Sequence, residues 1–193
     1  DNQSAARTTA PEEPSTVARP MVTGWVGLSS EDQLKLPSGA ALGNTPISIS
    51  SGLLQIKTTH GDSLIIEAPA KFQFDNTNSF HISYGKVVIE TLNHPQSIRM
   101  TYGIGNSIRG GDTYAVWAPE HTPDLYEVSS FRGKLVIRSS ENTARLSVGD
   151  HESLRHQTDG TAQTIPFHGD QFFKHLPQQD IMWTNVYDRS EKV

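Results

Sequence analysis

Eight histidines are the side chains of this sequence that are best suited to binding a metal ion. Zinc sites hold their ligands at short, fixed spacings such as His-Glu-x-x-His. No histidine here has that spacing or the spacing His-x-His, and the pair His151-Glu152 has no further partner at a matching distance. We therefore expect surface histidines and no metal site. The eight are His60, His81, His94, His121, His151, His156, His168 and His175.

Residue types used in catalysis are present, but they do not form a recognisable arrangement. Serine, histidine and aspartate all occur, yet the sequence has no Gly-x-Ser-x-Gly turn that would present a nucleophile. Gly103–Asn106 is glycine-rich, but no Lys-Ser/Thr pair follows it to hold a phosphate. No pair of carboxylates suggests glycoside hydrolysis. The sequence thus predicts a protein that is not an enzyme and that needs no cofactor.

The charge balance excludes some classes of partner. The 193 residues carry 16 Lys and Arg against 21 Asp and Glu, a net charge of -5. A nucleic-acid binder needs a basic surface that displaces counterions from phosphates, so we expect no nucleic-acid partner. The chain has no cysteine and no apolar run of the roughly 20 residues that cross a bilayer.

Aromatic side chains are the better candidates for a binding surface. Trp117, Tyr102 and Tyr126 lie on or beside expected strands, and we take them as the candidate binding residues. If Tyr114 faces the core, alternation turns Trp117 outward, where it can anchor a protein partner or a sugar ring. The alternative is that Trp117 caps the end of the core or meets the C-terminal tail.

Short apolar or alternating segments follow one another along the chain from Met21 onward. Alternation with a period of two indicates half-buried strands, and Gly, Asn, Asp, Ser or Pro closes each segment. No window between Met21 and His156 has a helical period, so we predict an all-β domain: a sandwich, a barrel or a solenoid. The expected strands are Ile47–Ser50, Leu53–Lys57, Ser63–Glu67, Lys71–Phe74, Ser79–Ser83, Lys86–Glu90, Ser97–Thr101, Thr113–Trp117, Leu125–Ser129, Lys134–Arg138 and Ala144–Val148.

Composition divides the chain into three parts. Residues 1–20 contain three prolines among small and polar residues, which indicates a disordered linker. Residues 21–157 form the all-β domain. Residues 158–193 begin as a loop and contain the apolar islands Phe172–Leu176 and Ile181–Trp183. These islands either pack back onto the sheet edge or begin a connection to a following domain.

An ordered series of short motifs between Gly52 and Gly149 resembles the FecR domain, the extracytoplasmic module of FecR-type anti-sigma regulators. Each motif alone is weak, but their order and spacing together are more specific, and they cover about half of the chain. The motifs are Gly52–Ile56, Leu64–Phe72, Ser83–Val87, Gly111–Val116, Phe131–Val136 and Leu146–Asp150.

This resemblance implies a stacked β-roll or β-solenoid. It also implies a periplasmic or cell-envelope module, tethered to the membrane through a segment before Asp1, that senses an envelope or outer-membrane protein and relays its state to an anti-sigma segment. The alternative is a structural or carbohydrate-binding module of a larger exported surface protein.

Overall fold

The computed structural model describes residues 19–92, 98–103, 106–122, 124–138, 145–157 and 159–177. Within them, the chain forms thirteen strands in one sheet, a short helix α1 (Ser30–Lys35) and a single 3-10 turn η1 (Gly169–Gln171). The all-β prediction is confirmed. The strands are β1 (Met21–Val26), β2 (Ile47–Ile49), β3 (Leu53–Lys57), β4 (Ser63–Asn76), β5 (Ser79–Glu90), β6 (Arg99–Tyr102), β7 (Asn106–Gly110), β8 (Thr113–Ala118), β9 (Leu125–Arg132), β10 (Leu135–Arg138), β11 (Arg145–Val148), β12 (Glu152–Gln157) and β13 (Ala162–Ile165).

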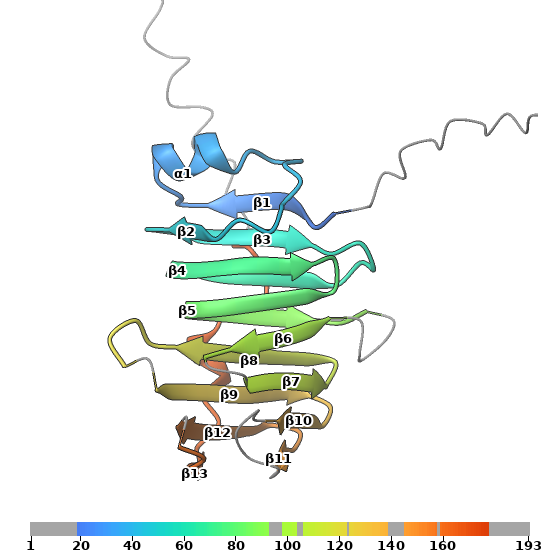
Figure 1. Ribbon diagram of the computed structural model, residues 1–193, viewed down its shortest axis with the longest axis vertical. Helices are drawn as coiled ribbons and strands as arrows, with labels where there is room; N and C mark the ends of the chain where they lie inside the picture. Colours follow the sequence, from blue (N-terminus) through green and yellow to red (C-terminus); the bar gives the residue numbers. More distant parts are fainter. Residues whose placement is uncertain are drawn as a thin grey trace, which may run out of the picture.

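The sheet curls into a half-barrel because β4 and β5 are long enough to belong to two arms. The first arm has the order β1-β3-β4-β5-β8-β9-β12-β13, and the second has the order β2-β4-β5-β6-β7-β10-β11. Figure 1 shows the strands stacked from β1, below α1, to β13 at the opposite end. Every described pairing is antiparallel except β5–β6. This pairing distinguishes the sheet from a parallel β-helix, the kind of solenoid in which successive coils pair in parallel.

The core lies between the inner faces of the two arms. Alternation in β8 turns Tyr114, Val116 and Ala118 inward, and all three are buried. Phe72 and Phe80, from the second-arm halves of β4 and β5, join the same cluster with ring centroids 5.7 Å apart. Removal of this apolar surface from water is the main favourable term that holds the arms together.

The passage of β5 from one arm to the other depends on Gly85. Its φ of 115° lies in a region that side chains rarely adopt. A Cβ at this position would lie 2.5 Å from the Cβ of Ala70 on β4. Glycine is therefore required here for both conformation and space.

Helix α1 covers the β1 end of the core. Ser29 caps it by accepting a hydrogen bond from the Asp32 backbone N–H at 3.1 Å. The Asp32 carboxylate accepts from the backbone N–H and hydroxyl of Ser50 at 3.1 and 3.0 Å. These bonds hold the pKa of Asp32 below its usual value, the Ser50 backbone N–H contributing most. Six residues are too few to display a helical period, so the sequence does not predict this helix.

Residues 166–177, called here the strap, run back across the outer face of the first arm (the orange segment in Figure 1). Phe167 and Phe172 each contact Phe131 of β9 edge to face, with centroids 5.3 and 6.2 Å apart. The strap covers a second, smaller apolar cluster formed by Leu53, Ile65, Val88, Ala115 and Phe131. For this reason Ala115 is buried although it points away from the main core.

Most expected strands are present, with shifted ends. The predicted segments Ser63–Glu67 and Lys71–Phe74 are one strand, β4, and Ser79–Ser83 and Lys86–Glu90 are both parts of β5. Strands β1, β7, β12 and β13 were not predicted.

Pro20, assigned to the linker, is buried, and its carbonyl accepts the Leu42 N–H at 2.8 Å. Residues 1–18 and the island Ile181–Trp183 lie outside the described residues.

Candidate functional site

Two of the three aromatic residues expected at a binding surface are core residues. Tyr102 on β6 is 0% exposed and Tyr126 on β9 is 2% exposed. Their ring centroids lie 4.8 Å apart where the two arms face each other. This burial corrects the expectation of a surface role. The sequence does not reveal that the second arm folds over the first, so it gives no means of distinguishing these tyrosines from outward ones.

The two tyrosines enclose His156 of β12. The His156 ring centroid lies 5.3 Å from that of Tyr102 and 5.7 Å from that of Tyr126, and its Nε2 is hydrogen-bonded to the Tyr102 hydroxyl. Burial lowers the pKa of His156, an effect that its contact with the Gln157 carbonyl partly offsets. Burial also raises the pKa of both tyrosines, so the cluster is neutral at pH 7. The three side chains thus form a polar cluster within the core, and the burial of His156 corrects the expectation that the histidines lie at the surface.

Trp117 lies on the outer face of the first arm, as alternation from Tyr114 predicts, and its side chain is half-buried. Cross-strand register places it directly between Lys86 of β5 and Glu127 of β9. The row continues to Glu67 on one side and to Arg155 on the other. We call Glu67, Lys86, Trp117, Glu127 and Arg155 the Trp117 row.

The charges of the Trp117 row alternate around the indole. Lys86 Nζ lies 3.5 Å from Glu67 Oε1, and Arg155 Nη2 lies 3.2 Å from Glu127 Oε2. Lys86 Nζ also donates to the Gln171 carbonyl of the strap at 3.3 Å. Glu127 is buried, while the side chains of Lys86 and Arg155 are 28% and 45% exposed. The exposed part of the row is therefore a central tryptophan with a charged side chain on each side, which is the composition of a binding hot spot.

A pocket of about 220 Å³ adjoins Trp117 at the bend between the two arms. Within it, Glu67 Oε2 is buried and has no hydrogen-bond partner in the described part of the chain. A buried acceptor without a partner is costly, so this oxygen is suited to a donor from a bound molecule. The lining residues are Glu67, Ala68, Pro69, Gly85, Lys86, Trp117, Ala118 and Glu120.

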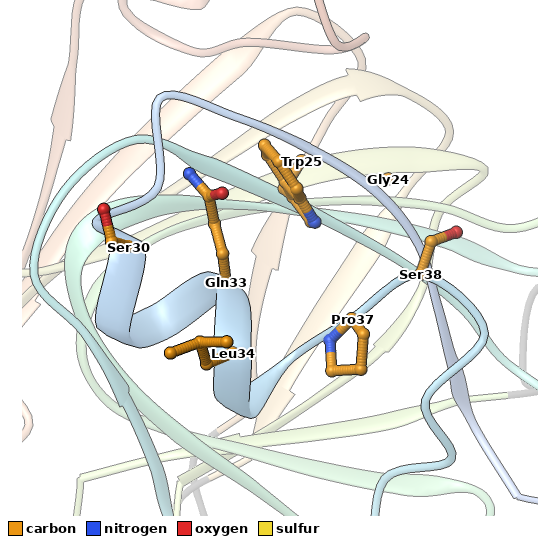
Figure 2. Close-up of a pocket in the computed structure, with 7 residues that line it drawn as sticks. All are labelled: Gly24, Trp25, Ser30, Gln33, Leu34, Pro37 and Ser38. Atoms are coloured by element: carbon orange, nitrogen blue, oxygen red, sulfur yellow. The ribbon is translucent and has the colours of Figure 1, made fainter.

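A larger groove of about 670 Å³ lies between α1 and β1. Figure 2 shows Gln33 extending from α1 on the side of Trp25, with Leu34 and Pro37 nearer the end of the helix. The Gln33 amide is already engaged, since it donates to the Leu28 carbonyl at 2.7 Å. The sequence does not predict this groove, because it forms only when α1 covers β1. Its lining is Gly24, Trp25, Ser30, Gln33, Leu34, Pro37 and Ser38.

The histidines in the described ranges occupy separate places. His81 Nδ1 lies 3.1 Å from the Thr101 hydroxyl, and His60 Nε2 lies 2.9 Å from Asn78 Oδ1. Among the described residues, no group of three His, Asp or Glu side chains could hold a metal ion. His94 lies outside them. In the part of the chain that the structure covers, no helix has the length and apolar character to span a membrane.

Comparison with known proteins gives a likeness of fold. No protein-family model and no curated protein sequence matches the chain. The solved structures that match include two crystal structures, at 2.50 and 1.65 Å resolution, of a proposed anti-sigma factor from Parabacteroides distasonis ATCC 8503. The chain has the fold of these structures. Each aligns with a TM-score of 0.51 over 63% of this chain, at 15% and 14% sequence identity. The chain spans 59% of the length of each.

Proposed function

We propose that this chain is a non-catalytic interaction module of an anti-sigma type regulator, similar to the FecR domain. The likeness of its fold to the two anti-sigma factor structures is the observation that carries the proposal. The ordered motifs between Gly52 and Gly149 support it independently, because they come from sequence rather than from shape. In this role the module lies in the periplasm or cell envelope and is tethered to the membrane.

The Trp117 row is the surface that we assign to the partner, an envelope or outer-membrane protein. A large aromatic side chain at the centre of an interface contributes most to affinity when it is shielded from water on binding. The charge pairs on its two sides favour a partner with complementary charges and fix its orientation. The module then acts by changing partners or conformation, and none of its residues does chemistry.

The regulatory role is tested by excising residues 20–177 from the chromosomal gene in the source organism and measuring all transcripts. We expect a set of genes with a shared promoter sequence to change together in one direction. The same excision in a strain that lacks the corresponding sigma factor should leave this set unchanged. Scattered changes without a common promoter would contradict the proposal.

A second candidate function is binding of a carbohydrate by an exported surface protein. The pocket beside Trp117 favours it, because an indole face, the free acceptor Glu67 Oε2 and the donor Lys86 are the groups that hold a sugar ring. Titration of the isotope-labelled protein with a panel of envelope saccharides tests this function. Shifts confined to the pocket and abolished by Trp117→Ala would support it, and an unchanged spectrum would exclude the sugars tested.

A further inference from the structure

The groove between α1 and β1 exposes apolar side chains that the described part of the chain does not cover. Leu34 on α1 is 85% exposed and Trp25 on β1 is half-buried, and both line the groove. Apolar side chains gathered around a hollow mark a place where another apolar segment packs.

The strap leads directly to this groove. Near its start, Phe167 of the strap contacts β9. Further along, the Phe172 ring lies 5.9 Å from Lys86 Nζ of β5, and Leu176 reaches β1. There, a Cβ placed on Gly24 would lie 2.9 Å from Leu176 Cδ1. Gly24 itself lines the groove. The contact between strap and sheet is therefore continuous up to the edge of the groove.

The chain that follows Pro177 carries a matching apolar segment. Ile181, Met182 and Trp183 are consecutive, and polar residues precede them. Extended chain covers at most about 3.6 Å per residue, so Ile181 lies within about 18 Å of Leu176. Helix α1, with six residues, is only about 9 Å long, so this reach exceeds the length of the groove along the helix. Residues 1–18 contain no Leu, Ile, Met or aromatic residue that could serve instead.

We propose that Ile181–Trp183 docks in the groove between α1 and β1 and covers Trp25 and Leu34. The strap crosses the outer face of the sheet as far as β1, and the segment that follows it then packs beside the helix that covers the end of the core. The connection at Pro177 raises the local concentration of the segment at the groove, which favours docking within one chain over binding of a second copy.

The absence of cysteine makes a direct test possible. The variant Leu34→Cys/Met182→Cys is oxidised mildly at low protein concentration, and the rate and the product are followed by mass spectrometry of peptides. The proposal predicts a disulfide within one chain. A control variant adds Ile181→Asp and Trp183→Asp, which leaves the tether length unchanged but removes the apolar side chains.

We expect the disulfide to form at least about tenfold faster in the first variant than in the control, since the control loses the burial of two large side chains. Equal rates would mean that the segment is merely tethered near the groove, and the proposal would be wrong. A disulfide between two chains would assign the groove to a second copy and would also overturn it. Circular dichroism of both variants verifies that the sheet is intact.

Discussion

His156 makes the stability of the fold depend on pH, because burial holds its pKa below the value of about 6.5 expected in an unfolded chain. At a pH between the folded and the unfolded pKa, the unfolded chain binds more protons than the folded chain. The stabilisation that is present above about pH 6.5 is therefore lost as the pH falls. His81 shifts in the same direction, also through burial. Hydrogen bonds, first that from the Ser50 backbone N–H, lower the pKa of Asp32, so the stabilisation that its carboxylate provides above about pH 4 is lost as the pH falls further.

We therefore expect the urea midpoint of the protein to fall between pH 7 and pH 5. The variant His156→Gln keeps a group that can hydrogen-bond to the Tyr102 hydroxyl but cannot be protonated. It should be less stable at pH 7, by about 1–2 kcal/mol, and should lose less stability on acidification. An identical pH dependence in the two proteins would show that His156 does not titrate with unfolding.

Gly85 permits a second residue-scale prediction. Gly85→Ala combines an unfavourable positive φ with a Cβ 2.5 Å from that of Ala70, so we expect a loss of about 3 kcal/mol or more in the free energy of unfolding. Gly61→Ala is the matched control, because Gly61 also has a positive φ of 89° but no atom lies within 4 Å of its Cβ position. It should lose only about 1–2 kcal/mol. Equal losses would contradict the close approach of β4 and β5.

Among the elements, strands rich in alternating or β-forming apolar residues were predictable. Thr113–Trp117 and Leu125–Ser129 alternate or carry β-forming residues, and they differ from β8 and β9 only at their ends. Strand β13 (Ala162–Ile165) is polar and pairs with β12 at the edge of the sheet, so its sequence has no apolar face to reveal it. For the apolar island Phe172–Leu176, packing back onto the sheet edge was one of the two alternatives. The structure places it on the outer face instead, a face that the sequence does not reveal because it is assembled from β3, β4, β5, β8 and β9.

The strap should contribute measurably to stability through the side chains that face the sheet. Phe172→Ala removes a ring that packs on Phe131, and we expect a loss of about 1–2 kcal/mol in chemical denaturation. The neighbouring Phe173 is 46% exposed, so Phe173→Ala should change stability by less than about 0.5 kcal/mol. Equal effects of the two substitutions would mean that the strap does not lie on the sheet as described.

For the molecule as a whole, the sequence was informative about one site residue out of three, for a physical reason. The outward direction of Trp117 follows from its own strand, since Tyr114 and Val116 fill the core on the other face. The burial of Tyr102 and Tyr126 depends on how β6 lies opposite β9 and β12 across the core, a relation between distant segments. The groove at α1 likewise forms only when the helix covers β1.

The proposed role in regulation depends on the Trp117 row as the surface that meets a partner. The measurement that tests it most directly compares transcripts from strains that carry single chromosomal substitutions. Trp117→Ala should reproduce the change in the gene set seen on excision of the whole module, while the purified variant keeps its strand-rich circular dichroism and its melting temperature within a few degrees.

Leu92→Ala, at an exposed position that is not on the Trp117 row, is the control and should leave the transcripts as in the parent strain. If Trp117→Ala gives the parental pattern although excision changes it, the partner binds elsewhere on the module. If neither substitution nor excision alters a coherent set of transcripts, the module does not act in transcriptional regulation, and the central claim is contradicted.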